Sequence, residues 1–187
     1  MSEMALYDDI YYIQRILAGE TDCFACLVDR YGRAVYSLVV KIVGNREDAE
    51  ELCQDVFVKV FRSLDSFKRN SSFSTWIYRI AYNTAISKTR YRKQEFLSIE
   101  EEQIINVSED DLNEMFGRSG NEEMLIRLDA AMEKLTREEC ALILLFYMQE
   151  KTVEDVAVIS GLSASNVKTR LHRIRKKLFV LMKEKGE

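Results

Sequence analysis

Apolar residues recur along most of the chain at spacings of three and four, which is the period of one face of an α-helix. The most regular run predicts a helix over residues 49–61, with these apolar positions on one side: Ala49, Leu52, Cys53, Val56, Phe57, Val60 and Phe61. Similar patterns predict helices over 8–18, 23–31, 35–43, 76–92 and 140–148, a short helix from Thr152, and a last helix from Ser163. No run alternates as a strand would, so the pattern predicts an all-α protein.

Cap and break residues divide these runs. We expect Gly19 to end the helix over 8–18 with Ile10, Ile13, Ile16 and Leu17 inward, and Gly32 to end the second helix, which Thr21 or Asp22 caps. Asn45, Thr136, Thr152 and Ser163 are expected N-caps, and Glu139 completes a capping box with Thr136. For the helix over 76–92 the expected cap is Ser74 or Thr75.

The chain has 187 residues, of which 47% are hydrophobic, and this size fits two domains of fewer than 100 residues each. Residues 95–123 carry ten acidic residues against Arg118 alone. Such a segment cannot bury enough apolar surface to fold by itself. The sequence therefore predicts two small helical domains, 1–95 and 124–187, joined by a flexible acidic linker over 96–123.

Residues 68–94 combine seven Lys or Arg residues, no acid and several aromatic residues. Cations neutralise phosphates while aromatic rings stack on bases, so this composition is typical of a surface for single-stranded nucleic acid. We expect Ile77, Ile80, Ala81, Thr84 and Ala85 to face the core, and Arg79, Tyr82, Asn83, Ile86 and Arg90 to lie nearer the outside. An amphipathic helix whose aromatic residues fill the core stays open as an alternative.

The last two short helices meet at Ser160, Gly161 and Leu162, the arrangement of a helix-turn-helix. The final helix has basic residues and no acid between Ser163 and Leu178, which is typical of a recognition helix for double-stranded DNA. An ordinary basic helical hairpin is the alternative. The net charge of −4 does not exclude DNA binding, because the charges are segregated along the chain.

These motifs carry a resemblance to a known family. Residues 73–83, FSTWIYRIAYN, resemble the promoter-melting segment of the sigma-70 family in its small extracytoplasmic-function (ECF) branch, although Ser87 stands where an acid is common. Residues 48–57 resemble that family's main contact with core RNA polymerase, and residues 155–178 resemble its domain four. Without this resemblance, the acidic face of the helix over 49–61 would be taken as a solvated face.

The resemblance implies three sets of site residues. The core polymerase contact would use Asp48, Glu50, Glu51, Gln54 and Asp55. The minus-10 element, including a base flipped into the loop before the helix, would be held by Ser71, Ser72, Phe73, Ser74, Trp76, Arg79 and Asn83. The minus-35 element would be read by Ser165, Asn166, Lys168, Thr169, His172, Arg173 and Lys176.

The predicted function is therefore an ECF-type sigma factor that binds core RNA polymerase and promoter DNA, both double-stranded and melted. The resemblance also implies a membrane-linked anti-sigma factor. We expect no enzymatic activity, cofactor, metal or small-molecule substrate, and a cytoplasmic location, since no export signal or membrane span is visible. Cys23 and Cys26 form a CxxC pair, but half-buried thiols are the expected state. The alternatives are a stand-alone helix-turn-helix regulator and an RNA-binding or protein-interaction module.

Overall fold

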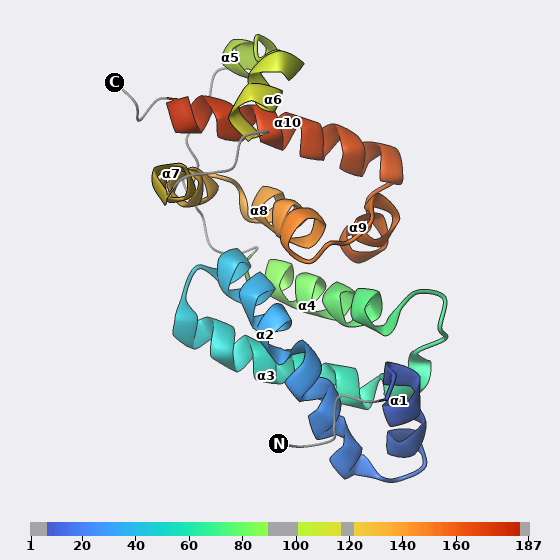
Figure 1. The fold of residues 1–187 in the computed structure, drawn as a ribbon. Helices are drawn as coiled ribbons and strands as arrows, with labels where there is room; N and C mark the ends of the chain where they lie inside the picture. Colours follow the sequence, from blue (N-terminus) through green and yellow to red (C-terminus); the bar gives the residue numbers. More distant parts are fainter. Residues whose placement is uncertain (1–6, 90–100, 117–121, 184–187) are drawn as a thin grey trace.

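The computed structural model describes residues 7–89, 101–116 and 122–183, and the regular structure in these ranges is helical, which confirms the predicted all-α class (Figure 1). The N-terminal bundle contains α1 (Asp9–Leu17), the 3₁₀ turn η1 (Thr21–Cys23), α2 (Phe24–Val43), α3 (Arg46–Arg62), the 3₁₀ turn η2 (Leu64–Ser66) and α4 (Phe73–Thr89). The C-terminal bundle contains α7 (Glu122–Met132), α8 (Arg137–Ile143), the π-helical turn η3 (Leu144–Met148), α9 (Val153–Ser160) and α10 (Ala164–Lys183). Between the bundles lie α5 (Glu101–Ile105) and α6 (Glu109–Phe116).

Helix α2 is one continuous helix, so the prediction that Gly32 ends a helix is wrong. A glycine inside a helix costs about 1 kcal/mol relative to alanine. Here Leu27 before the glycine and Val35 after it are both fully buried, so one apolar stripe continues through Gly32 and outweighs that cost. Thr21 and Asp22 form η1 instead of capping α2 with a side chain.

Most predicted caps are present. Asn45 accepts a hydrogen bond from the backbone N–H of Asp48, Thr136 and Glu139 form a capping box, and so do Thr152 and Asp155. Ser163 accepts from the N–H of Asn166, and Gly161 takes the left-handed conformation after α9. Local sequence chemistry therefore accounts for where these helices begin and end.

Two positions expected in the core are exposed. Leu17 is 55% exposed at the C-terminal end of α1, and Phe61 is 40% exposed near the end of α3, where its ring meets the edge of Phe24 of α2 at a centroid distance of 5.1 Å. Tyr12 takes the inward place on α1 instead, at 4% exposure.

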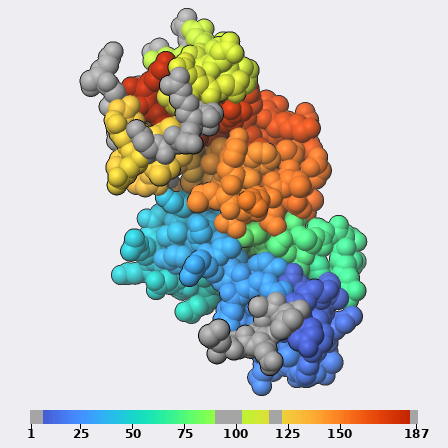
Figure 2. Space-filling model, in the orientation of Figure 1, coloured from blue at the N-terminus to red at the C-terminus, as the bar shows by residue number. Residues whose placement is uncertain are grey.

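The two bundles pack directly on each other. Helices α2 and α4 face α8 and α9, and the space-filling view shows the surface of the C-terminal bundle resting on α4 (Figures 1 and 2). Buried side chains of both bundles, from Leu27 and Ile42 to Leu145 and Ile159, belong to one contiguous apolar cluster. Helix α10 lies on the side of α8 and α9 that faces away from α4 (Figure 1).

The acidic segment, expected to be a flexible linker that does not fold by itself, contains α5 and α6 within residues 101–116. Val107 and Leu112 are buried against Phe179 of α10, and Ser108 caps α6 by accepting from the N–H of Asp111. The segment lacks a core of its own, as its composition indicates, but α10 offers an apolar surface that the composition does not reveal. Residues 96–100 and 117–121 of the predicted linker lie outside the described residues.

Candidate nucleic-acid interface

Helix α3 presents an acidic face opposite a buried stripe. Ala49, Leu52, Val56 and Val60 are each at most 4% exposed and hold the helix against α2 and α4. The opposite face carries Glu50, Glu51, Gln54 and Asp55, all exposed, while Asp48 in the first turn is half-buried. Because the exposed groups leave the packing of the bundle untouched, this face is available to a basic partner.

Helix α4 begins at Phe73, three residues before the predicted start, and its cap differs from the predicted Ser74 or Thr75. The Ser72 hydroxyl accepts from the N–H of Thr75 at 3.1 Å. The preceding loop passes through Arg69, whose φ of 57° is left-handed. Ser71 and Ser74 are half-buried and Ser72 is exposed, so the predicted serines do gather at one loop and helix start.

Phe73 belongs to the core of the N-terminal bundle. Its ring is 3% exposed and lies between the rings of Phe67, Tyr31 and Trp76, with centroid distances of 5.4, 5.6 and 5.7 Å. Trp76 is half-buried. For Phe73, the structure therefore agrees with the alternative that the aromatic residues of this segment fill the core.

Further along α4 the polar and aromatic residues separate. Arg79 and Asn83 are exposed, as expected. Tyr82, expected nearer the outside, is only 7% exposed, so that prediction is wrong. Its electrostatic neighbours Glu138 and Arg170 come from α8 and α10, which places Tyr82 under the C-terminal bundle.

Three hydrogen bonds join the start of α4 to the C-terminal bundle. Lys151 Nζ donates to Ser74 Oγ at 2.6 Å, Thr75 Oγ1 donates to Asp155 Oδ1 at 2.8 Å, and the Tyr78 hydroxyl donates to Gln149 Oε1 at 2.5 Å. Burial raises the pKa of Tyr78 to about 12. Burial also lowers the pKa of Lys151, against the opposing effect of Asp155. For Asp155, bonds from Thr75 and Thr152 outweigh burial and lower its pKa.

No sequence signal marks this contact. Thr75 and Asp155 are 80 residues apart, and Gln149 and Lys151 follow the predicted helix over 140–148 as ordinary polar loop residues. Asp155 also completes the capping box with Thr152 at the start of α9.

Helix α10 presents the predicted DNA-reading positions to the outside. Val167, Leu171, Ile174 and Leu178 are at most 5% exposed and fix its inner face. Its outer face has these exposed residues: Ser165, Asn166, Lys168, Thr169, His172 and Arg173. Lys176 is half-buried, and Asn166 accepts an intrahelical bond from Arg170 at 3.0 Å.

Two acidic residues contact α10. Lys177 Nζ donates to Glu139 Oε2 at 2.9 Å, and this bond, with those from Thr136, outweighs burial and lowers the pKa of Glu139. Lys177 is therefore part of the packing of α8 against α10. Glu109 Oε1 of α6 lies 3.2 Å from Nδ1 of His172, which is one of the exposed residues on the outer face of α10.

The four cysteines are unbridged. Burial raises the pKa of Cys53 and of Cys140 to about 11, so neither thiol is an activated nucleophile at neutral pH. Within the part of the chain that the structure describes, no group of three His, Cys, Asp or Glu side chains is placed to hold a metal ion. None of the described helices is long and apolar enough to cross a bilayer.

The chain combines three features: an acidic helix face, a basic helix with a capped loop, and an exposed helix-turn-helix. Together they are typical of helical DNA-binding proteins with two domains. A family model for sigma-70 region 2 matches residues 27–95, and a family model for sigma-70 region 4 matches residues 125–178. The ECF RNA polymerase sigma factor SigW of Bacillus subtilis is 29% identical over 174 residues, covering 89% of this chain and 92% of the relative. RNA polymerase sigma factor YlaC of the same organism is 31% identical over 159 residues, covering 84% and 90%. The chain belongs to the sigma-70 family, in its ECF branch.

Solved structures show the same fold. The chain matches CnrH, solved in complex with the cytosolic domain of CnrY, with a TM-score of 0.68 and 23% identity over 94% of this chain and 97% of that chain. It matches the sigma factor RpoE of Bartonella quintana, solved with the anti-sigma factor NepR, with a TM-score of 0.63 and 22% identity over 86% and 96%.

Proposed function

We propose that this protein is an ECF sigma factor that binds core RNA polymerase, directs it to promoters and helps to melt them. The observation that carries the proposal is the presence of three separate surfaces on one chain whose two bundles match regions 2 and 4 of the family. A stand-alone helix-turn-helix regulator would need only α9 and α10. Nothing in such a regulator requires the acidic face of α3 or the loop before α4.

Each surface has a proposed role. The face of α3 with Glu50, Glu51, Gln54 and Asp55 docks on a basic part of core polymerase, with Asp48 at its edge. The loop and first turns of α4 hold the opened minus-10 strand through Ser71, Ser72, Ser74, Trp76, Arg79 and Asn83, and Phe73 supports that loop from the core. The outer face of α10 reads the minus-35 duplex through Ser165, Asn166, Lys168, Thr169, His172 and Arg173, with Lys176 on a phosphate.

Docking on α3 is tested by reversing charge. The variant Glu51→Lys/Asp55→Lys should bind core polymerase at least tenfold more weakly, because both exposed carboxylates would then repel a basic partner. Asp22→Lys/Asp29→Lys is the matched control, since it makes the same charge change at exposed positions elsewhere in the N-terminal bundle. Equal affinities of the two variants, with unchanged circular dichroism, would place the polymerase contact elsewhere.

The function as a whole is tested by run-off transcription on genomic DNA with purified core polymerase. The expected result is a set of discrete transcripts that depend on this chain. The absence of chain-dependent transcripts, with binding to core intact, would reject initiation as its function. The transcripts would also identify the promoter used in the experiments below.

We also propose a membrane-linked anti-sigma factor as the partner that keeps the protein inactive in the cytoplasm. Support comes from the two structural neighbours, which were solved with the cytosolic domain of CnrY and with the anti-sigma factor NepR. A tagged copy recovered from uninduced cells should bring down a membrane protein with a cytosolic domain. Recovery of polymerase subunits alone would contradict this proposal.

A further inference from the structure

Helices α5 and α6 of the acidic segment pack along the outer side of α10, the side turned away from α8 and α9 (Figure 1). Val107 and Leu112 are 6% and 0% exposed, and both pack with Phe179 of α10, which is itself 6% exposed. Lys183 Nζ lies 4.5 Å from the centre of the Phe179 ring, within reach of a cation–π contact. A small apolar cluster therefore holds the acidic segment against α10.

The first turn of α6 is closed by reciprocal hydrogen bonds. The Ser108 N–H donates to Asp111 Oδ2 at 3.0 Å, and the Ser108 hydroxyl accepts from the Asp111 N–H at 3.1 Å. Glu109 and Leu112 are three residues apart, so they share a face of this short helix. Because Leu112 is buried against α10, Glu109 is also directed toward α10.

His172 lies on the same face of α10 as Phe179. The two residues are seven positions apart, which is about two helical turns and a rise of about 10 Å. Glu109 Oε1 lies 3.2 Å from His172 Nδ1, so the apolar cluster and this polar pair are two contacts of one docked segment. The His172 side chain is still 47% exposed, and its ring can therefore reach a ligand on the outer side.

A carboxylate beside a histidine ring selects one of the two tautomers of that ring. Carboxylate oxygens only accept hydrogen bonds, so an attractive pair of Glu109 and His172 requires the proton on Nδ1. In the neutral ring Nε2 is then unprotonated and is an acceptor. In the major groove the amino groups of adenine and cytosine are donors, whereas guanine and thymine present only acceptors. The orientation of His172 therefore fits the edge of an adenine or a cytosine.

We propose that Glu109 is a positioning residue for duplex reading: it fixes the ring of His172 so that Nε2 accepts from the amino group of an adenine or a cytosine in the minus-35 element. The apolar cluster around Phe179 keeps Glu109 in place. The acidic segment thereby takes part in the choice of sequence. The identity of the duplex rests on the proposed function, whereas the pairing of Glu109 with His172 does not.

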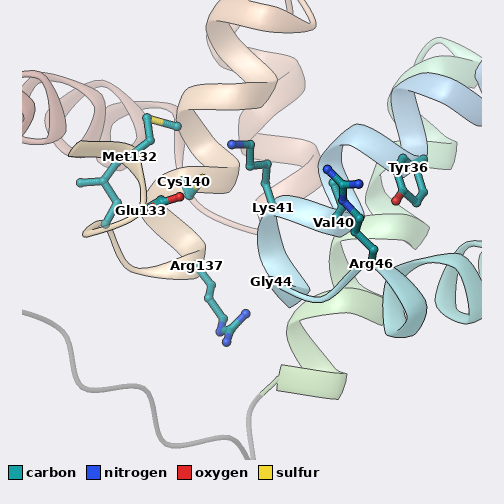
Figure 3. A pocket seen from close by; sticks show the side chains of 10 residues that line it. Tyr36, Val40, Lys41, Gly44, Arg46, Met132, Glu133, Arg137 and Cys140 are labelled. Carbon is teal, nitrogen blue, oxygen red and sulfur yellow. The ribbon is translucent and has the colours of Figure 1, made fainter. Parts of the chain in front are cut away.

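This contact lies on the far side of α10 from the interface between the two bundles (Figure 1). A pocket of about 710 Å³ at that interface is lined by described residues of α2, the start of α3 and the α7–α8 corner (Figure 3). Arg137 donates there to the carbonyl of Ile42, and Lys41 Nζ lies 3.0 Å from Asp129 Oδ1. A substitution in the first turn of α6 should therefore leave the packing of the bundles unchanged.

The test compares Glu109→Ala with Asp110→Ala. Both substitutions remove one exposed carboxylate from the first turn of α6, whereas the contact with His172 belongs to Glu109. The loss of either negative charge should raise the affinity for every duplex alike, because phosphates are then repelled less. This shared effect cancels when the two variants are compared.

The first measurement is NMR of the histidine ring nitrogens in the full chain without DNA. His172 is the only histidine in the sequence, so its signals need no further assignment. At alkaline pH, where histidine rings are neutral, the wild type and Asp110→Ala should carry the proton mainly on Nδ1. In Glu109→Ala the proton should shift toward Nε2. Identical ring signals in all three proteins would overturn the proposal.

The second measurement is competition binding of the complex with core polymerase to duplexes in which each base pair of the minus-35 element is replaced in turn. His172→Ala should lose about threefold to tenfold of the discrimination at one adenine or cytosine, the effect of one hydrogen bond. Glu109→Ala should lose most of that discrimination at the same base pair. Glu109→Ala/His172→Ala should match His172→Ala, because Glu109 acts through the ring.

Three outcomes of the binding experiment would reject the positioning role. They are an unchanged preference in His172→Ala, an equal loss of preference in Asp110→Ala, and a further loss in the double variant. Each would leave the proposed function standing, because initiation is scored separately by run-off transcription. The absence of chain-dependent transcripts would instead reject the proposed function, and the pairing seen by NMR would not depend on that result.

Discussion

Helices α4 and α10 are both basic, both carry an apolar inner stripe, and both are proposed to contact promoter DNA, but the starts of the two helices differ in exposure. The start of α4 faces the C-terminal bundle and is bonded to Gln149, Lys151 and Asp155. The start of α10 projects to the outside with Ser165, Asn166 and Lys168 exposed. The packing of the two bundles therefore covers the start of α4 and leaves the start of α10 exposed.

The largest expected effect comes from destabilising the bundle that covers the start of α4. Ile159 of α9 is 1% exposed, so Ile159→Ala should destabilise the C-terminal bundle by about 2–5 kcal/mol through the cavity that it leaves. Val158→Ala is the control, since Val158 is 43% exposed and its truncation should stay within about 0.5 kcal/mol. Urea unfolding followed by circular dichroism measures both changes. At urea concentrations at which the C-terminal bundle is unfolded, binding to the minus-35 duplex should disappear while binding to the single strand persists. Loss of both kinds of binding at the same urea concentration would contradict the distinction between α10 and α4.

A smaller effect is expected from side chains that contact bases. Arg173→Ala should weaken binding to the minus-35 duplex by about 1–3 kcal/mol and relax its sequence preference, as for a lost guanine contact. Asn83→Ala should leave duplex binding unchanged and weaken binding to a pre-melted minus-10 template. Competition assays on the two templates measure this division of roles. Equal losses of duplex binding in both variants would contradict it.

A phosphate contact should behave differently from a base contact on the same helix. Lys176→Ala should weaken binding to all duplex sequences alike and should reduce the salt dependence by roughly one counterion, because a phosphate contact carries no sequence information. Titrations at several salt concentrations on specific and random duplexes give both quantities. A sequence-dependent loss in Lys176→Ala would move this residue into the base-reading group.

The smallest expected effect reports directly on the cover over α4. Burial raises the pKa of Tyr78 to about 12, whereas the pKa of an exposed tyrosine is about 10. Because the pKa is raised where the bundles pack together, the contribution of Tyr78 to that packing is complete below pH of about 10 and is lost as the pH rises through about 12. In Gln149→Ala/Lys151→Met, which loses two of the three hydrogen bonds to the start of α4, its pKa should move down toward that of an exposed tyrosine, measured by NMR of ring-labelled tyrosine. Tyr12 is the internal control, since burial within the N-terminal bundle raises its pKa; a parallel fall there would point to general loosening.

Local signals in the sequence predicted much of the fold and of the candidate site. The caps at Asn45, Thr136 and Thr152 were predictable because a cap depends on one side chain and the next few backbone groups. The inner stripe of α10 was predictable because helical spacing alone places Val167 and Leu171 on one face. Among the misjudged positions, Val107 and Leu112 depend on a surface distant in the chain, because they are buried against α10. Gly32 lies in a helix whose apolar stripe continues on both sides of it, and the burial of that stripe comes from packing against other helices.

The sequence by itself determined the helical class, the acidic face of α3 and the exposed face of α10, because each follows from spacing and charge within about twenty residues. Family motifs in the same short segments determined membership of the sigma-70 family. Only the tertiary structure decided that Tyr78 and Tyr82 lie under the C-terminal bundle and that Lys151 holds Ser74. The physical reason is that burial depends on which surfaces meet, and contacts such as that between Thr75 and Asp155, 80 residues apart, arise from the packing of whole bundles and leave no periodic trace in the chain.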